Sequence, residues 1–154
     1  MTVLFTFKTE DMPKYLAKVR KAYKDKKLGF HVPLDCMDKE DEYEYEADAC
    51  KYTYSQGNHC AIGAMLPEDI AQILTDKHGS PSLAGLAGLD CGEVFNTILK
   101  IEAVIRQDLI DLQTAHDYCC NLGRRINTEE FEKYYEQPFV DLLTKLEQKY
   151  PMHQ

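Results

Sequence analysis

A cysteine and a histidine that could act as nucleophile and base stand in two separate motifs of the chain. Cys60 follows His59 in the stretch NHCAIGAML, residues 58–66, where a polar turn gives way to a short apolar helix. A helix N-terminus stabilises a thiolate, because its N–H groups and its dipole favour negative charge. His116 could serve as the base of a Cys–His hydrolase or transferase. Cys60 and His116 are therefore candidate catalytic residues.

His116 interrupts an apolar stripe in the longest helical pattern, which covers residues 93–120 as one helix or two. The stripe advances in steps of three and four residues, which keeps its members on one helix face: Ile101, Ile105, Leu109, Leu112, His116 and Cys119. A histidine on such a face should be buried, and it then needs a hydrogen-bond partner. The adjacent Asp117 is a third catalytic candidate. Its side chain should point about 100° away around the helix, so we do not expect it to orient His116.

The same residues also suit a purely structural role. Cysteine is among the most frequently buried residue types. Gly63 would allow the short helix after Cys60 to pack closely on residues 104–120. In this interpretation His116 hydrogen-bonds a backbone carbonyl or a polar side chain of the 58–66 turn, and His59 is exposed in that turn. The residues of the predicted packing lock are Cys60, Gly63, Gln113 and His116.

A zinc site is the third possibility for these side chains. The chain has six cysteines, which we expect to be reduced thiols: Cys36, Cys50, Cys60, Cys91, Cys119 and Cys120. They form no CxxC pair, and the nearest spacing to a ligand pair is His116-x-x-Cys119. Structural zinc needs four nitrogen or sulfur ligands, usually from two such pairs. We therefore predict no metal and no cofactor.

The charge of the chain is strongly polarised along its N-terminal third. The net charge of −8 disfavours nonspecific binding to nucleic acid. Residues 8–27 contain eight basic against three acidic residues, whereas residues 35–48 contain eight acidic residues against one lysine. These segments could simply be two solvated faces that attract one another, or they could form a surface for a charged partner. In the second case we predict that Glu42, Glu44 and Glu46 bind the partner.

The sequence pattern predicts that the elements which position these residues form a single, mainly α domain with a minor β element. Residues 2–7, TVLFTF, have the composition of a short strand. The remaining segments are a basic amphipathic helix over about 12–28, an acidic tyrosine-rich strand or loop at 35–54 and a helical core over 58–150. In that core Asn127 and Glu130 form a capping box, and Pro138 should break or restart the last helix.

Neither the first residues nor the apolar runs of the chain predict a signal peptide or a membrane-spanning helix. The first residues, MTVLFTFKTEDMP, lack the basic-then-apolar layout of a signal peptide. No apolar run approaches the roughly 18 residues that a membrane-spanning helix needs. We therefore expect a cytoplasmic protein.

Two short motifs resemble a family. The block N-x-C-A-I-G-A-M-L-P at residues 58–67 and the block L-Q-x-x-H-D at residues 112–117 resemble small uncharacterised proteins of phages and bacterial accessory genomes, whose core reads roughly CAxGxLxP followed by LQxxHD. The resemblance implies a shared pattern but no established activity: Cys60, Gly63, Pro67, Gln113, His116 and Asp117.

Accessory proteins of this size often act by binding a host protein, for example a defence complex. Our leading hypothesis is therefore a non-enzymatic protein that binds a host protein and has no direct contact with nucleic acid. The alternative is the Cys60–His116 enzyme.

Overall fold

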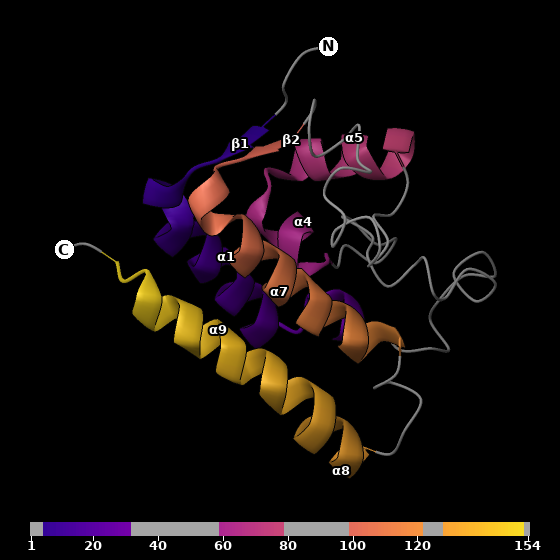
Figure 1. Cartoon of the computed structure of the whole chain (residues 1–154). Helices are drawn as coiled ribbons and strands as arrows, with labels where there is room; N and C mark the ends of the chain where they lie inside the picture. The colour runs from indigo at the N-terminus through magenta and orange to yellow at the C-terminus, as the bar shows by residue number, and fades with distance from the viewer. Residues whose placement is uncertain (1–4, 32–58, 79–98, 122–127, 153–154) are drawn as a thin grey trace.

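The computed structural model describes residues 5–31, 59–78, 99–121 and 128–152, and these residues form a mainly helical structure with one small sheet (Figure 1). This confirms the predicted fold class. The principal helices are α1 (Met12–Lys24), α4 (Ala61–Met65), α5 (Glu68–His78), α7 (Ala103–Asn121), α8 (Thr128–Phe131) and α9 (Gln137–Lys149). Three-residue 3₁₀ turns precede and follow α1 at Thr9–Asp11 and Gly29–His31.

The sheet pairs two segments from opposite parts of the sequence. Strand β1 (Phe5–Phe7) lies parallel to β2 (Leu99–Ile101), with Phe5 opposite Leu99. In β2 the side chains alternate between buried and exposed, as a strand on a core requires. The predicted helix over 93–120 is therefore wrong at 99–101, and residues 93–98 lie outside the described residues. Three residues are too few for an alternation of buried and exposed side chains to be recognised in the sequence, and the helical spacing of apolar residues continues directly after them.

Helix α1 is the predicted basic helix, but it ends four residues earlier than expected. Its buried face consists of Met12, Tyr15, Leu16 and Val19. The predicted helix extends to about residue 28, but Lys26 takes up the left-handed conformation with φ of 56°. The chain can then turn so that Leu28 forms a parallel bridge with His59. This turn brings the end of α1 beside the start of α4.

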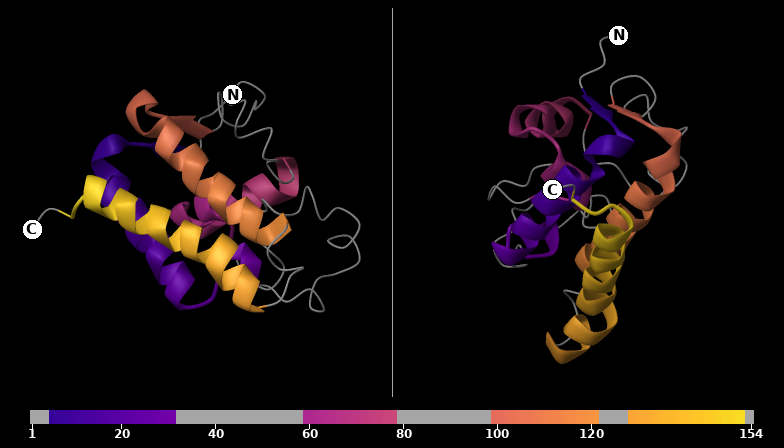
Figure 2. Two further views of the ribbon diagram at one scale, coloured as in Figure 1. Left: turned by 60° about the horizontal axis from the view of Figure 1, so that its bottom comes forward. Right: turned by 90° about the vertical axis from the view of Figure 1, so that its left-hand side faces the viewer.

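The described elements share one hydrophobic core. Helices α4 and α9 both pack against α1 and α7, and α7 and α9 lie side by side along their length (Figures 1 and 2). Polar contacts fix α9 at its C-terminal end. Arg20 of α1 donates from Nε to Glu147 Oε2 at 3.2 Å, and Lys149 donates to Asp108 of α7 at 2.9 Å.

The last helix widens before Pro138 and restarts as an α-helix there, which is one of the two predicted outcomes. A π-helical turn over Glu132–Glu136 joins α8 to α9, and the N–H of Gln137 donates to the carbonyl of Glu132. Pro138 stands in the first turn of α9. Proline has no N–H and its ring crowds the carbonyl four residues earlier, so a wider turn before it accommodates the ring. Asn127 of the predicted capping box lies outside the described residues.

Several predictions fall on parts of the chain that the structure does not describe. They include the acidic segment 35–54 with Glu42, Glu44 and Glu46, together with Cys36, Cys50 and Cys91. Within the described ranges no helix has the length and apolar character that crossing a membrane requires.

Candidate functional site

Cys60 is the N-cap residue of α4, as its place in the sequence predicted. Its backbone is extended (φ −70°, ψ 175°), and its Sγ accepts the N–H of Gly63 at 3.3 Å. Its side chain is 0% exposed. The sulfur therefore occupies the place of the usual N-cap oxygen and satisfies an N–H that the first helical turn leaves without a backbone partner.

Gln113 of α7 ties this short helix to the long one. Its Oε1 accepts the N–H of Ile62 at 2.8 Å, and its Nε2 donates to Asp117 Oδ1 at 2.7 Å. The amide thus joins the first turn of α4 to a carboxylate one turn further along α7. We expected His116 to bond this region, through a backbone carbonyl or a polar side chain of the 58–66 turn.

His116 instead connects α7 to the segment that follows α1. Its Nε2 lies 3.1 Å from the backbone nitrogen of Gly29, and its Nδ1 lies 3.1 Å from Asp117 Oδ1. Because a backbone N–H can only donate, Nε2 accepts and is unprotonated. The imidazole is therefore neutral, with its proton on Nδ1 directed at Asp117. The Gly29 N–H also donates to the carbonyl of His59 at 2.8 Å, which links His116 indirectly to the turn before Cys60.

The predicted orientation of Asp117 is wrong. Adjacent helical residues diverge by about 100°, yet Asp117 Oδ1 accepts from both Gln113 and His116. Helical side chains lean toward the helix N-terminus, which brings the carboxylate of Asp117 back over the preceding turn. The sequence argument considered the direction of Cα–Cβ and neglected the reach of the carboxylate.

These residues form a buried polar cluster that consists of Cys60, Gln113, His116 and Asp117, each 0% exposed. The rings of Phe30 and Phe139 pack on His116, with centroids 5.4 and 6.4 Å from the imidazole. Gly63, the remaining residue of the predicted lock, is buried in α4. His59, which we expected to be exposed, is half-buried.

The arrangement is suited to holding three segments together. The cluster joins the segment that follows α1, the start of α4 and the middle of α7 through buried hydrogen bonds. As a base for Cys60, His116 would need the lone pair of Nε2, and that lone pair already faces the N–H of Gly29.

Within the described ranges no group of three His, Cys, Asp or Glu side chains could hold a metal ion. Cys119, half of the sequence pair considered for zinc, is buried, and its Sγ donates to the carbonyl of Tyr135 at 3.3 Å. This contact links α7 to the π-helical turn.

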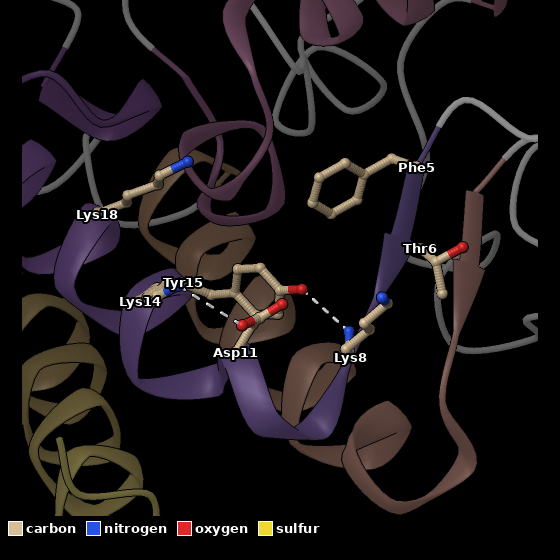
Figure 3. Close-up of a pocket in the computed structure, with 7 residues that line it drawn as sticks. All are labelled: Phe5, Thr6, Lys8, Asp11, Lys14, Tyr15 and Lys18. Atoms are coloured by element: carbon tan, nitrogen blue, oxygen red, sulfur yellow. Dashed lines mark hydrogen bonds and ion pairs between the residues drawn. The ribbon is translucent and has the colours of Figure 1, made fainter. Parts of the chain in front are cut away.

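A second site, which sequence reasoning missed, is an open hollow between β1 and α1 (Figure 3). Its volume is about 470 Å³, and we call it the lysine hollow after the residues that line it: Phe5, Thr6, Lys8, Asp11, Lys14, Tyr15 and Lys18. The four-residue spacing of Lys14 and Lys18 was visible in the sequence. The strand that forms the opposite wall was not predicted to fold back against this helix.

A smaller hollow of about 210 Å³ lies between α7 and the start of α9, and aromatic side chains line most of it: Ala115, Tyr118, Tyr134, Tyr135 and Pro138. Tyr118 and Tyr134 are 48% and 59% exposed. None of the four residues of the buried polar cluster lines either hollow.

No family model, curated protein or solved structure matches the chain. The resemblance to phage and accessory-genome proteins therefore stays a prediction from two short motifs.

Proposed function

We propose that this protein is a non-enzymatic, cytoplasmic binding protein of the phage or accessory-genome type, and that it contacts a host protein through its charge-polarised N-terminal part. Inhibition of a host defence complex is the more specific form of this proposal. The observation that supports it best is the exposed basic face of α1.

This basic face consists of lysines that project away from the core: Lys14, Lys18, Lys21 and Lys24. The side chains of Lys14 and Lys21 are 74% and 78% exposed, and each pairs with an aspartate of its own segment, at 3.9 and 2.7 Å. Exposed pairs of this kind contribute little to stability, so a partner's carboxylates can replace them easily. Arg20 differs, because its bond to Glu147 holds α9 and raises the pKa of its guanidinium.

The buried polar cluster supports the non-enzymatic part of the proposal. A catalytic thiol and its base must reach a substrate, whereas Cys60 and His116 are fully buried. Their hydrogen bonds to Gly63 and Gly29 also give each of them a structural use.

The experiment is recovery of a protein from host lysate at physiological salt, with the parent chain and three charge-reversal variants. We expect recovery of one specific protein by the parent, and its loss in E42K/E44K/E46K and in K18E/K21E/K24E. The control, K100E/K133E/K145E, reverses as many exposed lysines on other elements and should still recover it.

Loss of recovery in the control as well would show that overall charge governs capture, and would contradict the proposal. Full recovery by E42K/E44K/E46K would show that the acidic segment serves solubility alone. If the α1 variant also recovers the protein fully, charge polarity plays no part in binding.

A Cys60–His116 hydrolase or transferase is the second candidate, and one observation favours it. Asp117 accepts from Nδ1 of His116, which is how the carboxylate of a catalytic triad orients its histidine. The test is the pH dependence of Cys60 alkylation, followed by mass spectrometry of the peptide that contains it. A midpoint near about 8.5, the ordinary value for cysteine, would argue against an activated thiol.

A further inference from the structure

The lysine hollow has two walls of different chemistry. Phe5 from β1 and Lys18 from α1 extend toward the same space from opposite sides (Figure 3). The hydroxyl of Tyr15 accepts the backbone N–H of Lys8 at 2.9 Å and so fixes the end of β1 against α1. The hollow is therefore a feature of the fold itself, since this hydrogen bond between the Lys8 backbone and the Tyr15 side chain holds its walls together.

The aromatic part of the hollow rests on the core. The Phe5 ring contacts Phe7 and Tyr15 edge to face, with centroids 4.9 and 6.1 Å apart, and Phe5 stays partly exposed. Burial is the main cause of the raised pKa of Tyr15, so its hydroxyl stays neutral. An apolar side chain of a partner could pack against Phe5 without displacing a charged group.

The charged part is positive but not uniformly so. Lys8, Lys14 and Lys18 line the hollow together with Asp11, which lies 3.9 Å from Lys14. A compact, multiply charged phosphate would meet Asp11 as well as the lysines. Carboxylates on separate residues of a chain can meet one lysine each, and only the one at Lys14 then lies near Asp11, which favours an acidic peptide over a phosphate.

The spacing of two lysines indicates the conformation of such a peptide. Lys14 and Lys18 are four residues apart on α1, a rise of about 6 Å along the helix. In an extended chain every second side chain points to the same side, at intervals of about 6.7 Å. Acidic residues at alternate positions of an extended segment therefore match these two lysines.

We infer that the lysine hollow binds an extended acidic segment of the partner protein, with carboxylates at alternate positions on Lys14 and Lys18 and an apolar side chain against Phe5. The inference rests on the proposed function and adds to it the chemistry of the segment that is recognised.

The probe is a fluorescein-labelled peptide with glutamate and phenylalanine at alternate positions, measured by fluorescence anisotropy at physiological salt. Two variants form a matched pair, since Lys18 lines the hollow whereas Lys24 is also exposed on the same helix but lies outside it. We expect K18E to weaken binding at least about fivefold and K24E less than about twofold, because a reversed charge acts mainly on its nearest partner. Thermal melts should show that both variants are folded.

Two further probes separate the sources of affinity. Replacing phenylalanine by serine in the peptide should weaken binding, because the contact with Phe5 is lost, and sodium phosphate at 10-fold molar excess over the peptide should not displace it. Equal effects of K18E and K24E, or equal binding of the serine peptide, would overturn the inference. Displacement by phosphate would reduce the hollow to a general anion site and overturn it as well.

The lysate experiment distinguishes failure of this inference from failure of the proposed function. Capture that K18E abolishes and K24E preserves supports the inference directly. Capture that both single variants weaken equally, but K100E/K133E/K145E does not, overturns the hollow while the proposed function stands. Selective peptide binding without any host capture would contradict the proposed function and leave the peptide specificity of the hollow supported.

Discussion

The buried polar cluster and the lysine hollow use polar side chains in opposite ways. Gln113, His116 and Asp117 are 0% exposed and bond to one another or to backbone N–H groups. In the hollow, Lys8, Lys14 and Lys18 are exposed. The residues that most resemble a catalytic set are thus buried and hydrogen-bonded, whereas residues of ordinary type line an open hollow.

The energetic reason for this difference is desolvation. A buried polar group without a partner costs about 1–3 kcal/mol, so each member of the cluster must keep its hydrogen bonds. An exposed lysine keeps its water and gains little from any one neighbour. Substitutions should therefore affect stability in one region and binding in the other.

Within the buried polar cluster, the largest expected effect is that of His116→Ala. It should lower the free energy of unfolding by about 2–4 kcal/mol, because it leaves a cavity between Phe30 and Phe139 and removes one donor from Asp117. Urea denaturation followed by circular dichroism measures the loss. Gln107→Ala, at an exposed position of the same helix, is the control and should stay within about 0.5 kcal/mol of the parent.

A His116→Ala variant that unfolds like the parent but loses biological activity would contradict the contrast between a structural cluster and a binding hollow. It would show that the cluster has a function beyond packing, and it would make the Cys–His enzyme the better-supported function.

A smaller effect is expected at Cys60, where the structure sharpens the sequence-based estimate. The sequence alone predicts that Cys60→Ser costs roughly 1–2 kcal/mol, because a hydroxyl replaces a small apolar thiol. Cys60 caps α4, however, and serine is a preferred N-cap residue. The cost of Cys60→Ser should therefore fall below about 1 kcal/mol, whereas Cys60→Ala should cost about 1 kcal/mol through loss of the cap.

Thermal melts of the two Cys60 variants test this order, and host-protein binding should be unchanged in both. A serine variant that is clearly less stable than the alanine variant would mean that the apolar character of the thiol matters more than its capping bond.

Hydrophobic periodicity was enough to predict the helical class and the core face of α7. Ile105, Leu109, Leu112, His116 and Cys119 are all buried, as their spacing predicted. Short elements were harder. The spacing that indicates a helix continues back to Ile101, and only the parallel pairing with β1 makes residues 99–101 a strand.

The partners within the candidate site were also beyond sequence reasoning. Gln113 and His116 stood in a recognisable motif, but Gly29, which donates to His116, is 87 residues away along the chain. It reaches the imidazole because Lys26 turns the chain after α1. Such a contact depends on the tertiary path of the backbone, which local patterns do not contain.

The smallest expected effect on stability is that of Lys18→Ala, and it completes the comparison. Lys18 is exposed on α1, and alanine has a higher helix propensity than lysine, so the free energy of unfolding should change by less than about 0.5 kcal/mol. Leu16→Ala, two residues earlier and 1% exposed, should instead cost about 2–5 kcal/mol. Denaturation curves should be measured for both variants, together with their affinity for the acidic peptide. The two measurements separate the part of α1 that binds from the part that packs in the core. Lys18→Ala should weaken binding of the acidic peptide without affecting the fold. If it destabilises the protein as Leu16→Ala does, Lys18 belongs to the structural framework, and the contrast between the hollow and the buried polar cluster is wrong.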